Sequence, residues 1–267
     1  MSTDHVLVER HPHHATIVLN RPDKLNALTP DMYVRIGQLL AELEADDGVR
    51  AVVLRGNGKA FSSGFDLTHQ VRADDNDQRR RFLQQTANAN RWKIWNMSKP
   101  VVAQLHGYCL AGALELVLPS DFLIASESCR LGEPEVLFGT SPAFFAVPWI
   151  VNVRRAKQIL MTGEYFTAVE AERWGLVTSA VPEQELDQHV AKLVKRLVQL
   201  PPAAVRMIKE GVNRVYETLG MRAHIDSWVD SNLLLKTIET DETLTFKEKV
   251  RTEGVKAAIA WREELYS

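Results

Sequence analysis

Residues 101–125 decide the fold of this chain, and they read VVAQLHGYCLAGALELVLPSDFLIA. The β-branched and apolar runs at 101–105 and 122–125 predict two short, buried strands. Between them, the sequence predicts a turn at His106 and Gly107 and a helix over 111–118. Strands that are separated by crossover helices are typical of α/β folds in which the pairing is largely parallel.

The same alternation of short strands and helices precedes this stretch. We expect three further strands and two further helices, at 5–8, 15–19, 51–54, 30–45 and 77–97. Thr29 is a suitable N-cap for the first of these helices, and Pro30 suits its first helical position. The repeated order of strands and helices therefore predicts that the first part of the chain is one α/β unit.

From about residue 154 onward the periodicity is helical almost throughout, and Pro201 and Pro202 interrupt it. We therefore divide the chain into an α/β core over 1–200 and a helical region over 201–267. A helical region of this size is too small to form a hydrophobic core of its own. Its apolar faces are expected to pack on the main body or on another subunit.

Composition and charge exclude several classes of protein. The chain has 32 Lys and Arg against 34 Asp and Glu, a net charge of −2, so it lacks the basic stripe that nucleic acid requires. No apolar stretch reaches the roughly 18–20 residues that cross a bilayer, and the N-terminal residues lack an apolar secretory segment. The two cysteines, both among apolar neighbours, suit a reducing compartment. We therefore expect a cytoplasmic protein with no nucleic-acid or membrane partner.

Two glycine turns are candidates for binding an oxyanion. Gly64 lies in a turn that can direct backbone N–H groups into a cleft. Gly112 opens the expected helix, where its N–H has no intrahelical partner. Together the two turns could present a pair of donors to one carbonyl oxygen, which is how enzymes stabilise an enolate. Taken alone, the first of them favours a purely structural turn over a functional one.

Two acids are candidates for proton transfer. Glu115 is alone in a run of Ala, Leu and Val that otherwise predicts a buried helix, and burial of an unpaired carboxylate is costly. The alternative is that it pairs with an arginine or points outward. Glu135 follows twenty residues later, in a loop that leads into another apolar run. Two carboxyl groups at one dry cleft would supply the acid and the base for adding water across a double bond.

The chain resembles the enoyl-CoA hydratase/isomerase (crotonase) superfamily over nearly its whole length. The motifs that carry the resemblance are residues 20–28 (NRPDKLNAL), 61–67 (FSSGFDL), 99–103 (KPVVA), 106–108 (HGY) and 138–142 (FGTSP). The resemblance implies a spiral of ββα units, a helical C-terminal region that builds trimers or hexamers, and an acyl-CoA thioester as substrate. Coenzyme A is then part of the substrate, and no cofactor is expected.

The resemblance also implies roles for individual residues. The backbone N–H groups of Phe65 and Gly112 would form the oxyanion hole. Glu115 would activate the water, and Glu135 would deliver a proton to the α-carbon. Substrate contacts would fall on Lys24, Ala27, Ser63, Gly64, Asp66, Leu67, Ala111, Phe144 and Phe145. No metal site is expected, because the early histidines have no partners at ligand spacing.

Three departures from the family pattern matter. Where the family usually has a glycine-rich turn, this chain has Phe144 and Phe145, which could wall off a long acyl tail, stack on an aromatic acyl group or join the core. Glu133 adds a third acid where a neutral residue is common. Trp261 replaces a lysine that commonly assists the CoA phosphates, and Arg262 is a possible substitute.

The sequence therefore predicts an enoyl-CoA hydratase that forms a 3-hydroxyacyl-CoA through an enolate, as in fatty acid metabolism. Two alternatives stay open. One is an enoyl-CoA isomerase, which would use Glu135 alone to move a proton between carbons. The other is a non-catalytic paralogue that binds acyl-CoA without turnover.

Overall fold

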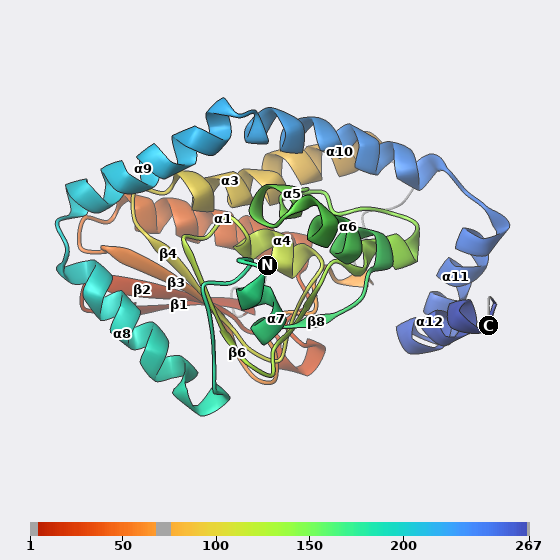
Figure 1. Ribbon diagram of the computed structural model, residues 1–267, viewed down its shortest axis with the longest axis horizontal. Coiled ribbons are helices and arrows are strands. Elements are labelled where there is room, and N and C mark those ends of the chain that lie inside the picture. The colour runs from red at the N-terminus through yellow and green to blue at the C-terminus, as the bar shows by residue number, and fades with distance from the viewer. Residues whose placement is uncertain (1–4, 68–75, 266–267) are drawn as a thin grey trace.

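The computed structural model describes residues 5–67 and 76–265, and it contains two β-sheets wrapped by helices (Figure 1). The larger sheet has the strand order β1-β2-β3-β4-β6-β9. Its strands are β1 (Val6–His11), β2 (His14–Leu19), β3 (Ala51–Gly56), β4 (Val101–Leu105), β6 (Phe122–Ser126) and β9 (Ser179–Val181). β1 pairs with β2 in the antiparallel direction, and every other pair in this sheet is parallel. The prediction of an α/β fold with largely parallel pairing is confirmed.

The smaller sheet was missed by the sequence analysis. It contains β5 (Tyr108–Leu110), β7 (Arg130–Gly132) and β8 (Phe166–Thr167), with β5 parallel and β8 antiparallel to β7. These strands have only two or three residues each, so no period-2 pattern is long enough to be recognised. β5 occupies the connection where we expected only a turn, and it positions the start of the next helix.

The helices follow the predicted order along the chain. Those of the α/β unit are α1 (Pro30–Ala45), α2 (Asn76–Phe82), α3 (Asn88–Asn96), α4 (Gly112–Val117), α5 (Val147–Ile150), α6 (Val153–Thr162), α7 (Ala168–Arg173) and α8 (Leu186–Gln199). The C-terminal ones are α9 (Pro202–Thr218), α10 (Met221–Thr237), α11 (Asp241–Thr252) and α12 (Val255–Glu264). Short 3-10 turns are η2 (Pro22–Lys24), η5 (Pro134–Phe138) and η6 (Glu183–Glu185). No described helix is long and apolar enough to cross a membrane.

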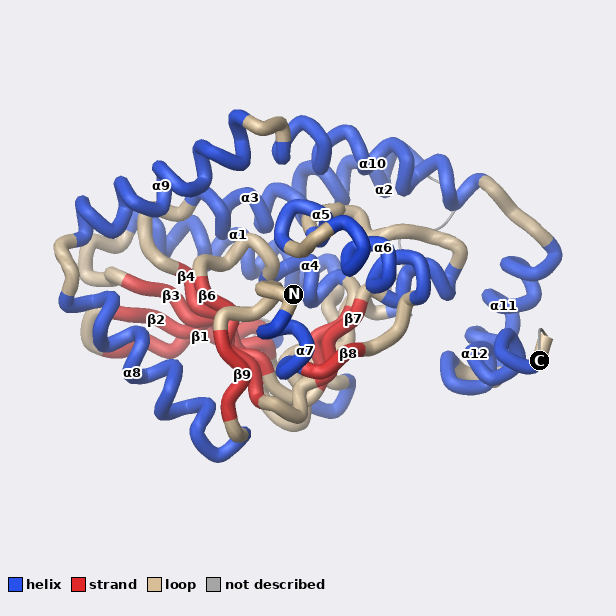
Figure 2. The backbone as a smooth tube through the Cα atoms, in the orientation of Figure 1, coloured by secondary structure: helices blue, strands red, loops and turns tan. Residues whose placement is uncertain are grey.

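The two faces of the larger sheet are buried by different helices, because alternate residues of a strand point to opposite faces. Val52 and Leu54 face the main core, which α1 closes with an apolar face that includes Leu39 and Leu40. Ala51 and Val53 belong instead to a second cluster that α8 covers. Figure 2 shows the sheet between these helices. As predicted, the hydroxyl of Thr29 caps α1 by accepting a hydrogen bond from the amide of Met32 at 3.3 Å.

The charged helix expected over 77–97 is present, but it is not regular. A π-helical turn, η4 (Leu83–Ala87), separates α2 from α3. A π turn adds a residue to the helical repeat and changes the direction of the side chains that follow it. After this turn, Asn88, Asn90 and Arg91 are all buried.

The helical region over 201–267 is joined to the main body by polar contacts. The ammonium group of Lys209 on α9 lies 2.7 Å from the carboxylate of Asp121 and donates to the carbonyl oxygens of Ile94 and Lys99. Figure 1 shows α9 and α10 along one side of the molecule, with α11 and α12 beyond the end of α10. Whether residues 201–267 form an oligomerisation region remains a prediction.

Candidate active site

The two predicted glycine turns pack against each other. Gly64 has a φ of +95°, and a Cβ atom there would lie 2.7 Å from the carbonyl oxygen of Leu110 and 2.9 Å from Cβ of Ala111. A Cβ on Gly112 would lie 2.4 Å from the ring of Phe65. Glycine at these positions therefore lets the two turns approach more closely than any other residue would allow.

The amides at this junction are available to a ligand. Among the described residues, neither the N–H of Phe65 nor that of Gly112 donates a hydrogen bond. The residue before Gly112, Ala111, has a φ of +53°, which is uncommon for a residue with a Cβ. Such strain persists only where the surroundings impose it, and it is often found at functional sites. Here the amide of Ala111 is held by the carbonyl oxygen of Gly132 at 2.8 Å.

A cavity of about 410 Å³ opens at this junction. Eight of the thirteen predicted site residues line it, namely Ala27, Ser63, Phe65, Asp66, Leu67, Ala111, Glu115 and Glu135. These residues come from four separate segments of the chain, and the fold brings them together. The roles that the sequence analysis gave to them remain predictions.

Glu115 is 1% exposed and is held in place by a buried arginine. Its Oε2 lies 3.1 Å from the guanidinium of Arg91 and accepts the amide hydrogen of Phe144 at 2.6 Å. From the sequence, an arginine partner was the alternative to a functional role for Glu115. In the structure Glu115 has an arginine partner and also lines the cavity, so the two possibilities do not exclude each other.

Glu133, which is buried, and Glu135, which is partly buried, form a second pair of acids. Burial raises the pKa of Glu135 to about 8, and the negative charge of Glu115 adds to this effect. Burial also raises the pKa of Glu133, well above its ordinary value, and the charge of Glu135 adds to that effect. Neither carboxyl oxygen of Glu133 has a hydrogen-bond partner if both groups are ionised. We therefore expect the pair to share at least one proton at neutral pH.

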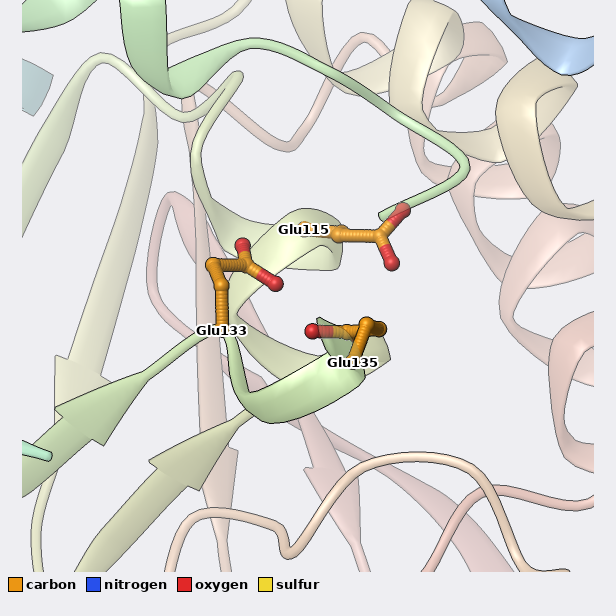
Figure 3. A group of neighbouring side chains, drawn as sticks. All are labelled: Glu115, Glu133 and Glu135. Atoms are coloured by element: carbon orange, nitrogen blue, oxygen red, sulfur yellow. The ribbon is translucent and has the colours of Figure 1, made fainter. Parts of the chain in front are cut away.

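The three glutamates meet in one space. One oxygen from each of Glu115, Glu133 and Glu135 lies within 4.8 Å of the others, and Figure 3 shows them reaching this space from α4 and from the η5 segment. Carboxylate oxygens at this spacing could hold a hard divalent cation. However, Arg91 balances one negative charge, and the raised pKa values of the other two acids favour a proton over a metal. This arrangement fits proton transfer better than metal binding.

We expect the Glu133→Gln variant to lose less stability than the unaltered protein as the pH rises. The folded-state pKa is raised, so the stabilising contribution is present below the unfolded-state pKa of about 4.3 and is lost as pH rises toward the folded-state value. The melting temperature of the unaltered protein should therefore fall as the pH rises above about 4.3.

Glu133→Gln should reduce this fall, because its amide stays neutral and can donate to Glu135. Thermal unfolding at several pH values measures the effect, and Glu127→Gln on the surface is the matched control. Parallel curves for the unaltered protein and Glu133→Gln would show that Glu133 is already ionised.

Phe144 and Phe145 do not line the cavity. Phe144 is 0% exposed and packs against Trp92 in the core. Phe145 stacks on Trp228 of α10 with a centroid distance of 4.1 Å. Of the three possibilities raised by the sequence, the structure supports core packing for Phe144. Phe145 is partly buried against α10, and its predicted substrate contact is not supported by the lining of this cavity. Ala143, the residue just before Phe144, is the part of this segment that lines the cavity.

Four other predicted residues are not among those that line the cavity. Gly64 and Gly112 pack the two turns together where the cavity opens. Lys24 is an exposed residue in η2, and its predicted contact with CoA is not tested. Arg262 has partners within the protein, because its guanidinium stacks on Phe246 at 4.0 Å and donates to the carbonyl oxygen of Leu137.

Several residues of the site were missed by the sequence analysis. Arg91 and Tyr33 support Glu115 and the Gly112 turn, and the Tyr33 hydroxyl donates to the carbonyl oxygen of Gly112 at 3.1 Å. Arg79, Tyr165 and Lys236 line the cavity. No local motif marks these residues, because they reach the site from helices and loops that are distant in sequence.

Comparison with known proteins gives a consistent result. Residues 11–254 match the profile that describes enoyl-CoA hydratase/isomerase proteins. The chain is 31% identical to a short-chain-enoyl-CoA hydratase from Clostridium acetobutylicum, over 96% of this chain and 99% of that one. A solved enoyl-CoA hydratase/isomerase from Xanthobacter autotrophicus Py2 is 36% identical, with a TM-score of 0.92 and 98% coverage of both chains. An enoyl-CoA hydratase from Mycobacterium smegmatis is 25% identical, with a TM-score of 0.86, 97% coverage of this chain and 93% of that one.

Proposed function

Because this chain belongs to the enoyl-CoA hydratase/isomerase family, we propose that it catalyses the reversible addition of water to a 2-enoyl-CoA. The observation that carries the proposal is that Glu115 and Glu135 line one cavity, beside two amides that have no acceptor among the described residues. An isomerase needs one proton shuttle, whereas hydration needs a base for water and an acid for carbon.

The proposed reaction gives each of these groups one step. The thioester oxygen accepts hydrogen bonds from the amides of Phe65 and Gly112. Glu115 takes a proton from water through Oε1, the oxygen that Arg91 and Phe144 leave open. Hydroxide adds to the β-carbon, and the negative charge that develops on the thioester oxygen is stabilised by the two amides.

Glu135 completes the addition by donating a proton to the α-carbon. Its pKa of about 8 keeps it protonated at neutral pH, which suits this role. The reverse sequence of steps dehydrates a 3-hydroxyacyl-CoA. This acid–base chemistry requires no redox cofactor, and coenzyme A arrives as part of the substrate.

The oligomeric state is also part of the proposal. We propose that residues 201–267 build a homotrimer, or a hexamer of two trimers, through the apolar surface of α9. Five exposed apolar side chains support this proposal, namely Met207, Ile208, Val212, Val215 and Leu219. Exposed apolar surface of this kind marks interaction sites. Sedimentation velocity of the full chain measures the assembly, and a monomer would contradict it.

The test of the reaction is the fate of oxygen from water. Incubation with crotonyl-CoA in H₂¹⁸O is expected to remove the absorbance of the conjugated thioester and to give 3-hydroxybutyryl-CoA that carries one ¹⁸O atom, as measured by mass spectrometry. A 3-enoyl-CoA that is converted to a 2-enoyl-CoA without hydration would identify an isomerase instead. Binding of both compounds without turnover would identify a non-catalytic paralogue.

A further inference from the structure

Two cationic side chains line the cavity beside the acids. Arg79 comes from α2 and Lys236 from α10. Phe82 of α2 and Leu83 of the following π turn pack against Val229 and Leu233 of α10. Among the described residues, neither cation has a carboxylate within ion-pair distance or a hydrogen-bond acceptor. The next residue, Arg80, shows the contrast, because it pairs with Asp230 at 2.9 Å on the surface.

The environment of Lys236 is unfavourable for an unpaired charge. Burial lowers its pKa to about 7, and the positive charge of Arg79 adds to this effect. Burial also lowers the pKa of Arg79. Partly buried cations without partners reduce stability, and an anion that binds between them would compensate this cost. The two side chains therefore form a candidate site for an anionic group of the substrate.

The position of Lys236 indicates which part of the ligand carries the anion. Lys236 lines the same cavity as Glu115 and Glu135, the two acids that we propose to act on the reacting carbons. The pantetheine arm separates the diphosphate of CoA from the thioester, and cations that bind the diphosphate therefore lie far from those carbons. A carboxylate at the end of a short acyl chain, in contrast, stays near the reacting carbons.

We propose that Lys236 and Arg79 form a subsite for a carboxylate at the distal end of the acyl group, so that the preferred substrate is an ω-carboxy-2-enoyl-CoA. The inference rests on the proposed hydration reaction and names its substrate class. The ammonium and the guanidinium would each donate charge-assisted hydrogen bonds to the carboxylate. The apolar side chains of Phe82 and Leu83 would line the chain between the carboxylate and the double bond.

The test compares 2-hexenedioyl-CoA with 2-hexenoyl-CoA, which differ in having a carboxylate or a methyl group at the same end. We expect the unaltered protein to hydrate the carboxylated compound with the higher kcat/KM. Lys236→Met should lower kcat/KM for 2-hexenedioyl-CoA by roughly 10- to 100-fold, the effect of losing a hydrogen bond to a charged group. It should change the value for 2-hexenoyl-CoA far less. Arg80→Met, which removes a surface charge from the same helix, is the matched control and should change neither value.

Each other outcome has a definite meaning. Equal losses for both compounds in Lys236→Met would indicate that the lysine serves CoA or the fold, and would overturn the proposal. No preference of the unaltered protein for the carboxylated compound would also overturn it, while the hydration reaction would stand. If the unaltered protein hydrates neither compound, the proposed reaction fails, and calorimetric binding then decides the subsite. Tighter binding of 2-hexenedioyl-CoA that Lys236→Met abolishes would support it, and equal binding would overturn it.

Discussion

Glu135→Gln is expected to lower the rate of crotonyl-CoA hydration by about 10²–10⁴-fold. The substitution removes the acid that we propose to protonate the α-carbon, and it keeps the size and the hydrogen-bonding capacity of the side chain. The loss should therefore appear in kcat rather than in KM, because the acid acts on the transition state and contributes little to binding. Steady-state kinetics with Glu127→Gln as the surface control measures the effect. Retention of most of the activity would remove Glu135 from the mechanism.

The pH profile gives an independent test of the same residue. In the unaltered protein, the pKa of Glu135 is raised to about 8, so its acid form persists at neutral pH and is lost above that value. The rate of hydration should accordingly fall as pH rises through about 8, with an apparent value that belongs to the coupled pair of Glu133 and Glu135. This limb should be absent from the residual activity of Glu135→Gln. If the limb persists, another group provides the proton.

The sequence predicted most of the larger sheet and the helices that cover it. The strand expected at 101–105 and the helix expected over 30–45 have the predicted boundaries. Both have clear physical signals, a β-branched run in one case and an N-cap followed by proline in the other. The smaller sheet was missed because its strands are too short for a period to be detected. Their pairing depends on contacts between segments that are distant in the sequence.

The sequence predicted only part of the candidate site, because some of its residues also lack a local signal. Glu115 attracted attention because a carboxylate in an apolar helix requires an explanation, and Gly64 because a turn needs its conformation. Arg91 carried no such signal, because an arginine in a charged helix is ordinary until the fold buries it. The π turn at Leu83–Ala87 determines which residues of the following helix point inward, and no pattern in the sequence predicted it.

Phe144 illustrates the remaining limit of sequence interpretation. Its apolar side chain could equally line a pocket or join the core, and only the fold decides between them. The structure places its ring in the core, whereas its backbone amide donates to Glu115. Its contribution to the site is therefore made by an atom that every residue except proline possesses, and the identity of the side chain could not reveal it.

Arg91→Met is expected to cause the largest loss of stability among these variants. The arginine is 0% exposed, and its guanidinium lies 3.1 Å from Glu115 and 2.5 Å from Oδ1 of Asn88. It also lies between the rings of Tyr33 and Phe144, at 5.9 and 5.6 Å. Removal of one partner of a buried ion pair costs about 3–5 kcal/mol, because the other charge stays buried without compensation. For a chain of this size, the melting temperature should fall by roughly 6–20 °C.

The double variant Arg91→Met with Glu115→Gln separates the two possible causes of this loss. If the uncompensated carboxylate is responsible, removal of its charge should restore much of the stability, because apolar or neutral replacements of a whole ion pair are often close to neutral. The double variant should nevertheless remain inactive as a hydratase, since it lacks the base for water. If the double variant is no more stable than Arg91→Met, the loss of stability comes instead from lost packing against the two rings. Arg91 would then serve mainly to fill the core, and the electrostatic positioning of Glu115 would depend on the amide of Phe144.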